Sequence, residues 1–196
     1  MAARWGWIAL AYALVGAFAA AITVVWRGAS PLVHSDGWLG LDLVTAHVYS
    51  LSAGLTFGAL LVLMTRVSVH YFEWARQLHR ALRPFCHGLS LPAVVLLALL
   101  SACGEELLFR GLLQPLMGLV PQAVVFGLLH YLPGPSRWVW VGWATAVGVA
   151  LGGLFAASGS LLGPIAAHAL VNGLNLAFLR SHDPAPRRSL GGLLGH

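Results

Sequence analysis

The sequence predicts an all-α fold, a polytopic membrane helix bundle of about six transmembrane helices with a short interfacial helix. Hydrophobic residues make up 59% of the 196 residues and charged residues only 9%, and the mean hydropathy is +0.81. A soluble domain carries roughly 25% charged residues. Long apolar runs separated by short polar connections complete the pattern. Because lipid offers no partners to backbone groups, each run is expected to be helical.

Six apolar runs are long enough to be candidate spans. The first follows Arg4 and ends in Trp26 and Arg27, an interfacial pair, and it is too long for a cleaved signal peptide, so we interpret it as a retained helix. The predicted spans are about Trp5 to Trp26, Leu43 to Met64, Leu89 to Leu116, Val120 to Leu132, Trp138 to Ala157 and Leu161 to Leu179.

Two connections are unusual. Residues 69–84 alternate aromatic and basic side chains at helical spacing, which is typical of an amphipathic helix in the membrane interface. A solvated connecting helix is the favoured interpretation, and substrate gating is the alternative. The fourth run is short for a crossing and precedes Pro133-Gly-Pro-Ser-Arg137, so we expect the chain to turn within the membrane and to line a water-containing cavity.

The basic residues indicate topology rather than nucleic acid binding. All 11 are arginines. Eight of them follow the second, fourth and sixth runs, and Arg4 precedes the first, as expected if both termini are cytoplasmic in a bacterial inner membrane. These eight are Arg66, Arg76, Arg80 and Arg83, then Arg137, and then Arg180, Arg187 and Arg188. Residues 1–180 are predicted to form one integral membrane domain, and residues 181–196 a flexible cytoplasmic tail. The oligomeric state is left open by the sequence.

Ionisable residues inside the third run are the strongest indication of function. Glu105 and Glu106 are two of only six acidic residues in the chain, and a carboxylate within a membrane span is costly unless it is paired. Adjacent helical residues project about 100° apart. Glu106 is therefore expected to pair with Arg110 four residues later, which leaves Glu105 unpaired and suited to act as a general base.

Further polar side chains lie at a matching depth. His130 follows Phe126 by four residues in the fourth run, while His168, Asn172 and Asn175 share nearly one face of the sixth. At about 1.5 Å per residue, Glu105, His130 and His168 lie roughly 10 to 16 Å from the same end of the bundle. We expect these groups to meet in one layer, in the outer half of the bilayer. Interhelical hydrogen bonding is the favoured explanation for Asn175.

Three short motifs carry a resemblance to a known family. They read EExxxR at Glu105 to Arg110, FxxxH at Phe126 to His130, and HxxxN at His168 to Asn172, in that order on successive runs. Together they resemble the CPBP family of intramembrane peptidases, which includes CAAX prenyl proteases and bacteriocin-processing Abi proteins. The resemblance covers residues 89–180, and the first two runs lie outside it.

The resemblance implies an intramembrane endopeptidase. Glu105 and His130 would activate water, and His168 and Asn172 would stabilise the oxyanion. Glu106, Arg110 and Phe126 would support these residues. No cofactor is expected; the alternative is Zn²⁺ held by Glu105, His130 and His168, although the usual HExxH spacing is missing.

The substrate class is implied only broadly. The expected partner is a membrane-anchored or lipidated peptide or protein within the bilayer, cleaved near its C-terminus, and processing of C-terminal sorting signals is one such reaction. Two other function classes remain open. One is a non-catalytic bacteriocin-immunity or scaffold protein, and the other is a small transporter that uses buried Glu and His side chains as a proton relay.

Overall fold

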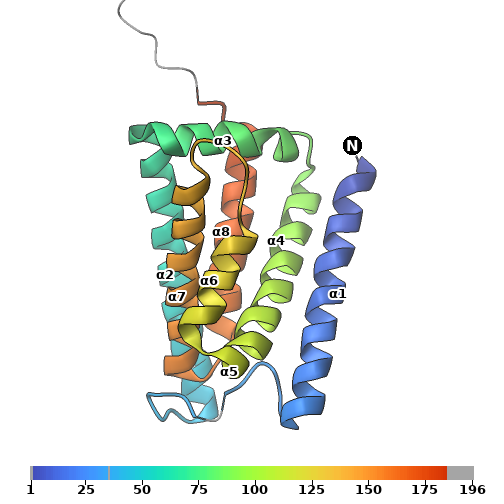
Figure 1. Cartoon of the computed structure of the whole chain (residues 1–196), viewed down its shortest axis with the longest axis vertical. Helices are drawn as coiled ribbons and strands as arrows, with labels where there is room; N and C mark the ends of the chain where they lie inside the picture. Colours follow the sequence, from blue (N-terminus) through green and yellow to red (C-terminus); the bar gives the residue numbers. More distant parts are fainter. Residues whose placement is uncertain (1, 35, 185–196) are drawn as a thin grey trace, which may run out of the picture.

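The computed structural model describes residues 2–34 and 36–184, so most of the predicted tail, residues 181–196, lies outside the described residues. The chain is an all-α membrane helix bundle, as predicted (Figure 1). Its elements are α1 (Ala2–Arg27), α2 (Leu43–Tyr71), α3 (Glu73–Cys86), α4 (Leu91–Glu106), the π-helix η1 (Leu107–Leu113), α5 (Gln114–Met117), α6 (Leu119–Leu129), α7 (Arg137–Ser158) and α8 (Leu162–Ser181).

Five helices in the described residues are long and apolar enough to cross a membrane: α1, α2, the continuous run of α4, η1 and α5, and then α7 and α8. The fourth predicted run forms the shorter helix α6, which has 11 residues. The segment 130–136 then continues along the bundle as an extended connection before α7 returns (Figure 1). The chain therefore passes along the bundle here as a short helix followed by a loop.

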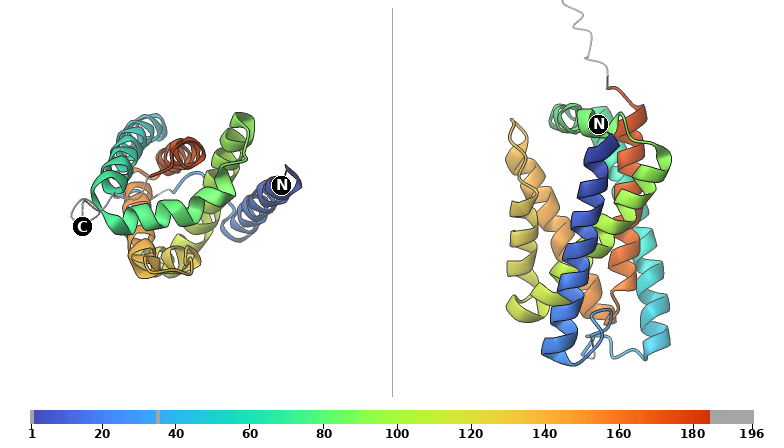
Figure 2. Two further views of the ribbon diagram at one scale, coloured as in Figure 1. Left: turned by 90° about the horizontal axis from the view of Figure 1, so that it is seen from above. Right: turned by 90° about the vertical axis from the view of Figure 1, so that its right-hand side faces the viewer.

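The interfacial helix α3 lies across one end of the bundle (Figures 1 and 2). The start of α1 and the end of α8 lie at this same end. His79 of α3 bonds through Nε2 to the His182 carbonyl oxygen at 2.9 Å, and the Ser136 hydroxyl donates to the Trp74 carbonyl at 3.1 Å. The amphipathic helix is thus fixed both to α8 and to the connection that precedes α7.

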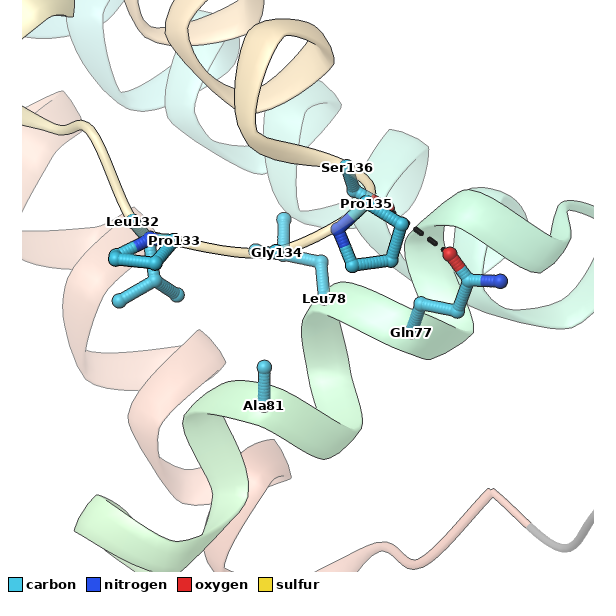
Figure 3. A pocket seen from close by; sticks show the side chains of 8 residues that line it. All are labelled: Gln77, Leu78, Ala81, Leu132, Pro133, Gly134, Pro135 and Ser136. Atoms are coloured by element: carbon cyan, nitrogen blue, oxygen red, sulfur yellow. Dashed lines mark hydrogen bonds between the residues drawn. The ribbon is translucent and has the colours of Figure 1, made fainter.

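Figure 3 shows the contact between α3 and the connection that follows α6. Gln77, Leu78 and Ala81 face the segment Leu132–Ser136, and the two sides enclose a shallow hollow. The Ser136 hydroxyl also lies 3.3 Å from Gln77 Oε1. Because this segment begins two residues after His130, α3 helps to fix the position of the histidine at the end of α6.

The opposite end is closed by the segment between α1 and α2. The His34 amide donates to the Gly159 carbonyl at 2.8 Å, and the Leu161 amide donates to the Leu32 carbonyl at 3.0 Å. Gly159 ends α7 with φ of 72°, a left-handed conformation that glycine adopts at little cost. These bonds hold the start of α8, and therefore the depth of His168, against the rest of the bundle.

Two helix crossings rely on glycine. Gly54 of α2 and Gly163 of α8 are in direct backbone contact, and a Cβ on Gly104 of α4 would lie 2.5 Å from the Tyr12 carbonyl oxygen of α1. Small residues at such crossings allow the backbones of membrane helices to approach closely. They place α4 and α8, the two helices with most of the predicted site residues, at fixed distances from α1 and α2.

Candidate active site

Glu105 lies at the centre of the polar cluster predicted from the sequence. Its Oε2 atom is 3.8 Å from His130 Nε2 and 3.8 Å from His168 Nε2. The atom is buried and has no hydrogen-bond partner within the described residues. Three helices, α4, α6 and α8, thus bring one carboxylate and two imidazoles together, as their common depth in the sequence predicts.

The orientation of His130 follows from the end of α6. Its Nδ1 lies 2.8 Å from the Phe126 carbonyl oxygen, and a carbonyl only accepts, so Nδ1 carries the hydrogen. In the neutral ring, Nε2 then presents a lone pair toward Glu105. Two acceptors 3.8 Å apart do not bond to each other, but a water molecule between them can donate to both.

His168 is held from its other side by Glu106. Nδ1 of His168 lies 2.7 Å from Glu106 Oε1, and Arg110 Nη1 donates to the same oxygen at 2.8 Å. The Glu106 and Arg110 side chains are both 0% exposed. The predicted ion pair between them is present, and it has a function that the sequence reasoning missed, which is to orient His168.

The two adjacent glutamates contact the same histidine, although adjacent helical residues project about 100° apart. Glu105 faces Nε2 of His168, and Glu106 bonds to Nδ1 of the same ring. Their side chains do diverge around α4, as expected for adjacent helical residues. An imidazole has two nitrogens on different edges, however, and it fits between the diverging carboxylates.

Asn172 lies one turn after His168 and contacts α4. Its Nδ2 donates to the Ser101 hydroxyl oxygen at 2.9 Å. Asn175 instead lies against α2, where its Oδ1 accepts from Arg66 Nη1 at 2.9 Å. Asn175 therefore makes the interhelical hydrogen bond expected for it, while Asn172 lines the same cavity as the two histidines.

Phe126 is the common packing partner of the site. Its ring centroid lies 4.4 Å from the His130 ring and 6.0 Å from the His168 ring, and the Arg110 guanidinium lies 4.7 Å above it. The ring also meets Phe109 edge to face at 4.9 Å. A cation over an aromatic face is stabilised by the ring's charge distribution, so Phe126 supports both the ion pair and the histidines.

A small open cavity of about 60 Å³ lies beside the cluster, between α2, α6, α7 and α8. His130, His168 and Asn172 form its polar wall, and most of the rest is apolar or aromatic. Trp140 contacts His130 edge to face at 6.0 Å. Such a largely apolar cavity with a few convergent polar groups is typical of a ligand site.

Several residues around the site were not identified from the sequence. The π-helix η1 follows directly after the paired glutamates and contains Arg110, and such bulges are frequent at functional sites. Tyr12 of α1 adjoins the Glu105 carboxylate without forming a regular hydrogen bond to it. Helix periodicity carries no signal for the π-helix or for the Tyr12 contact, because both depend on which helices become neighbours.

No group of three His, Cys, Asp or Glu side chains within residues 2–34 and 36–184 is arranged to hold a metal ion. Each histidine of the cluster has its Nδ1 bonded to a carbonyl or carboxylate oxygen and its Nε2 3.8 Å from Glu105 Oε2, an arrangement that metal-ligating histidines also show.

Comparisons with known proteins support the family that the motifs indicate. Residues 87–174 match a family described as type II CAAX prenyl endopeptidase Rce1-like. The chain is also 38% identical over 85 residues to the uncharacterized protein YpbD of Bacillus subtilis (strain 168), and this match covers 42% of the chain and 43% of YpbD. No solved structure gives a significant match.

Residues 87–174 are thus similar to the Rce1-like family of type II CAAX prenyl endopeptidases, in agreement with the resemblance carried by the three motifs. All of the predicted site residues from Glu105 to Asn172 lie within the matched region. Helices α1, α2 and α3 lie outside it. The apolar helices and the family together define the chain as an integral membrane protein.

Proposed function

We propose that the chain is an intramembrane endopeptidase that hydrolyses a peptide bond near the C-terminus of a membrane-anchored or lipidated substrate. The observation that carries the proposal is the meeting of Glu105 with His130 and His168 beside the cavity. A carboxylate with a buried oxygen that makes no hydrogen bond, next to an oriented imidazole, is suited to general base catalysis. The family match over residues 87–174 supports the same reaction class.

In the proposed mechanism, Glu105 takes a proton from a water molecule that also donates to His130 Nε2. The hydroxide attacks the carbonyl carbon of the scissile bond, and the carbonyl oxygen becomes an oxyanion. An Asn172 Nδ2 hydrogen and a hydrogen on His168 Nε2 stabilise that charge. Glu105 then passes its proton to the departing amine as the carbon–nitrogen bond breaks.

The charges around His168 favour its role as a donor. Glu105 and Glu106 bring two negative charges and Arg110 brings one positive charge into a region where Glu106 and Arg110 are fully buried. A His168 ring with hydrogens on both nitrogens carries one positive charge. Together with Arg110 it balances the negative charges of Glu105 and Glu106, since a buried charge needs a partner. Its Nδ1 hydrogen then bonds to Glu106, and its Nε2 hydrogen points toward the reacting groups.

We propose that this chemistry needs no metal ion. The support is that the Glu105 carboxylate and the His130 imidazole can activate the water by themselves. Activity of the purified protein that survives a strong chelator is the expected result. Loss of activity in chelator and its recovery with Zn²⁺ would contradict this part of the proposal.

We also propose that the end of the bundle covered by α3 faces the cytoplasm, which places both termini there. The arginine pattern supports this orientation. The test introduces single cysteines into a variant without Cys86 and Cys103. A cysteine at Asp36 should react with an impermeant thiol reagent added outside the cell. A cysteine at Gly88 should react only after the membrane is permeabilised. The reverse pattern would invert the orientation and move the site to the cytoplasmic half.

The function is tested by comparing the C-termini of membrane proteins in cells that produce the wild-type chain or Glu105→Gln. We expect shortened C-termini only with the wild type. A non-catalytic immunity or scaffold protein predicts that protection of the cell from a bacteriocin survives the double change Glu105→Ala and His168→Ala, with no difference in C-termini.

A further inference from the structure

The amide of Asn172 can help to stabilise an oxyanion only if its nitrogen, and not its oxygen, faces the cavity. The two ends of an asparagine amide have nearly the same size and shape, so packing alone distinguishes them poorly. A hydrogen-bond partner whose donor and acceptor roles are already fixed is needed. In this structure the partner is Ser101, which the three motifs do not include.

The role of Ser101 is fixed by its own helix. Its hydroxyl donates to the Ala98 carbonyl oxygen at 3.3 Å, so its single hydrogen is already used. Toward Asn172 the hydroxyl oxygen can only accept, and Asn172 Nδ2 donates to it at 2.9 Å. The flipped amide would set two acceptors against each other unless the hydroxyl gave up its bond to Ala98, so the network favours the nitrogen toward Ser101.

The position of Ser101 connects it to the rest of the site. It is 6% exposed and lies on α4 one turn before Glu105, so both side chains project from the same side of the helix. Asn172 Nδ2 has two hydrogens. Ser101 holds one of them, and the other remains for the cavity, which Asn172 lines together with His130 and His168.

We propose that Ser101 is a positioning residue for the reaction, which orients the Asn172 amide so that one N–H faces the oxyanion. This inference rests on the proposed peptidase function. Ser101 itself does not touch the substrate and acts only through Asn172. The same helix α4 therefore supplies the base, Glu105, and the hydroxyl that orients the oxyanion donor.

The test is a double-mutant cycle with Ser101→Ala, Asn172→Ala and the double variant, measured as kcat and KM on a peptide that the wild type cleaves. Losing one oxyanion donor costs about 10² to 10³ in kcat, and we expect about that loss for Asn172→Ala. Ser101→Ala should lower kcat about tenfold with KM unchanged, because misorientation affects the transition state more than binding. In the Asn172→Ala background, Ser101→Ala should cause no further loss.

A control is Ser52→Ala, which removes an exposed serine of α2 whose hydroxyl, like that of Ser101, donates to a carbonyl of its own helix. It should leave kcat unchanged. If Ser101→Ala does not fold, Ser101→Cys replaces it, because a thiol of similar size is only a weak acceptor. An unchanged kcat in Ser101→Ala, or a loss that multiplies with that of Asn172→Ala, would overturn the inference while leaving the peptidase function intact. If the wild type cleaves nothing, the proposed function fails instead.

Discussion

At the level of single residues, the adjacent glutamates of α4 occupy different environments. Glu105 has an unpaired oxygen beside two imidazoles. Glu106 is fully buried and bonds through one oxygen to both Arg110 and His168. A carboxylate with two charge-assisted bonds is held firmly in place, so Glu106 is suited to fix the geometry and Glu105 to exchange a proton.

Removing Glu106 should separate its effect on stability from its effect on His168. Glu106→Leu leaves the buried Arg110 guanidinium with its bond to the Gly148 carbonyl but without the carboxylate it pairs with, and breaking such a pair costs about 3 to 5 kcal/mol. The double variant Glu106→Leu, Arg110→Met should recover much of the thermal stability, because replacement of both charges by apolar groups is often neutral. Cleavage should stay lost in both variants, since neither holds Nδ1 of His168.

Thermal unfolding in detergent and cleavage rates, measured on the same preparations, check this prediction. Restored cleavage in the double variant would show that Glu106 serves only to neutralise Arg110. A double variant as unstable as Glu106→Leu would show that the pair itself is needed for packing.

At the level of elements, the depth of His168 depends on where α8 crosses α2. Gly163 contacts the backbone of Ser50, and the Ser50 hydroxyl accepts from the Gly163 amide at 3.1 Å. This crossing lies five residues before His168 in the same helix. A rigid helix transmits a displacement at its start to the residues that follow.

Gly163→Ala should therefore lower both the unfolding temperature and kcat, because the added methyl group forces α8 away from α2. A loss of about 1 to 3 kcal/mol is typical of overpacking. The matched control is Gly153→Ala in α7, where no atom lies within 4 Å of an added Cβ and alanine favours the helix. Equal unfolding temperatures and equal kcat values for the two variants would refute the idea that this crossing fixes the position of His168.

The contact between α3 and α8 should weaken in acid. His79 is buried against Phe178 and His182, and this burial lowers the pKa of His79, with the positive charges of Arg66 and Arg83 and the His182 ring nearby. When α3 is not packed against α8, His79 has the ordinary histidine pKa of about 6.5. Below that pH, His79 binds more protons in the unpacked state than in the packed one. The stability that the contact between α3 and α8 has above pH 6.5 is therefore lost as the pH falls.

His79→Phe should retain the packing and reduce the pH dependence of the unfolding temperature between about pH 7 and 5, where the ordinary histidine pKa lies. The comparison is made in detergent with the wild type over the same range. Identical slopes for the two proteins would contradict a contribution from His79.

At the level of the whole molecule, the sequence predicts the helices better than their contacts. The runs that become α1, α2, α7 and α8 are visible as hydropathy because lipid requires long apolar helices. The meeting of Glu105, His130 and His168 follows from a common depth. These features depend on distance along a helix, which the sequence encodes directly.

The missed features depend on which helices become neighbours. The Glu106 bond to His168 and the Ser101 bond to Asn172 both join α4 to α8. The π-helix after Glu106 changes the local helix register, and hydropathy carries no signal for it. Pro133 and Pro135 indicate that α6 is short. The sequence does not show that the helix ends at Leu129, or that Phe126 and His130 at this end line the cavity.

The central claim is that Glu105 activates water for peptide hydrolysis within the membrane. The most direct measurement incubates the purified chain in liposomes, in H₂¹⁸O, with a membrane protein whose C-terminus is shortened in cells that produce it. Mass spectrometry of the new C-terminus then reports both cleavage and the source of the oxygen. The account predicts one ¹⁸O atom in the new carboxylate with the wild type and no cleavage with a folded Glu105→Gln variant; cleavage that persists in that variant would contradict it.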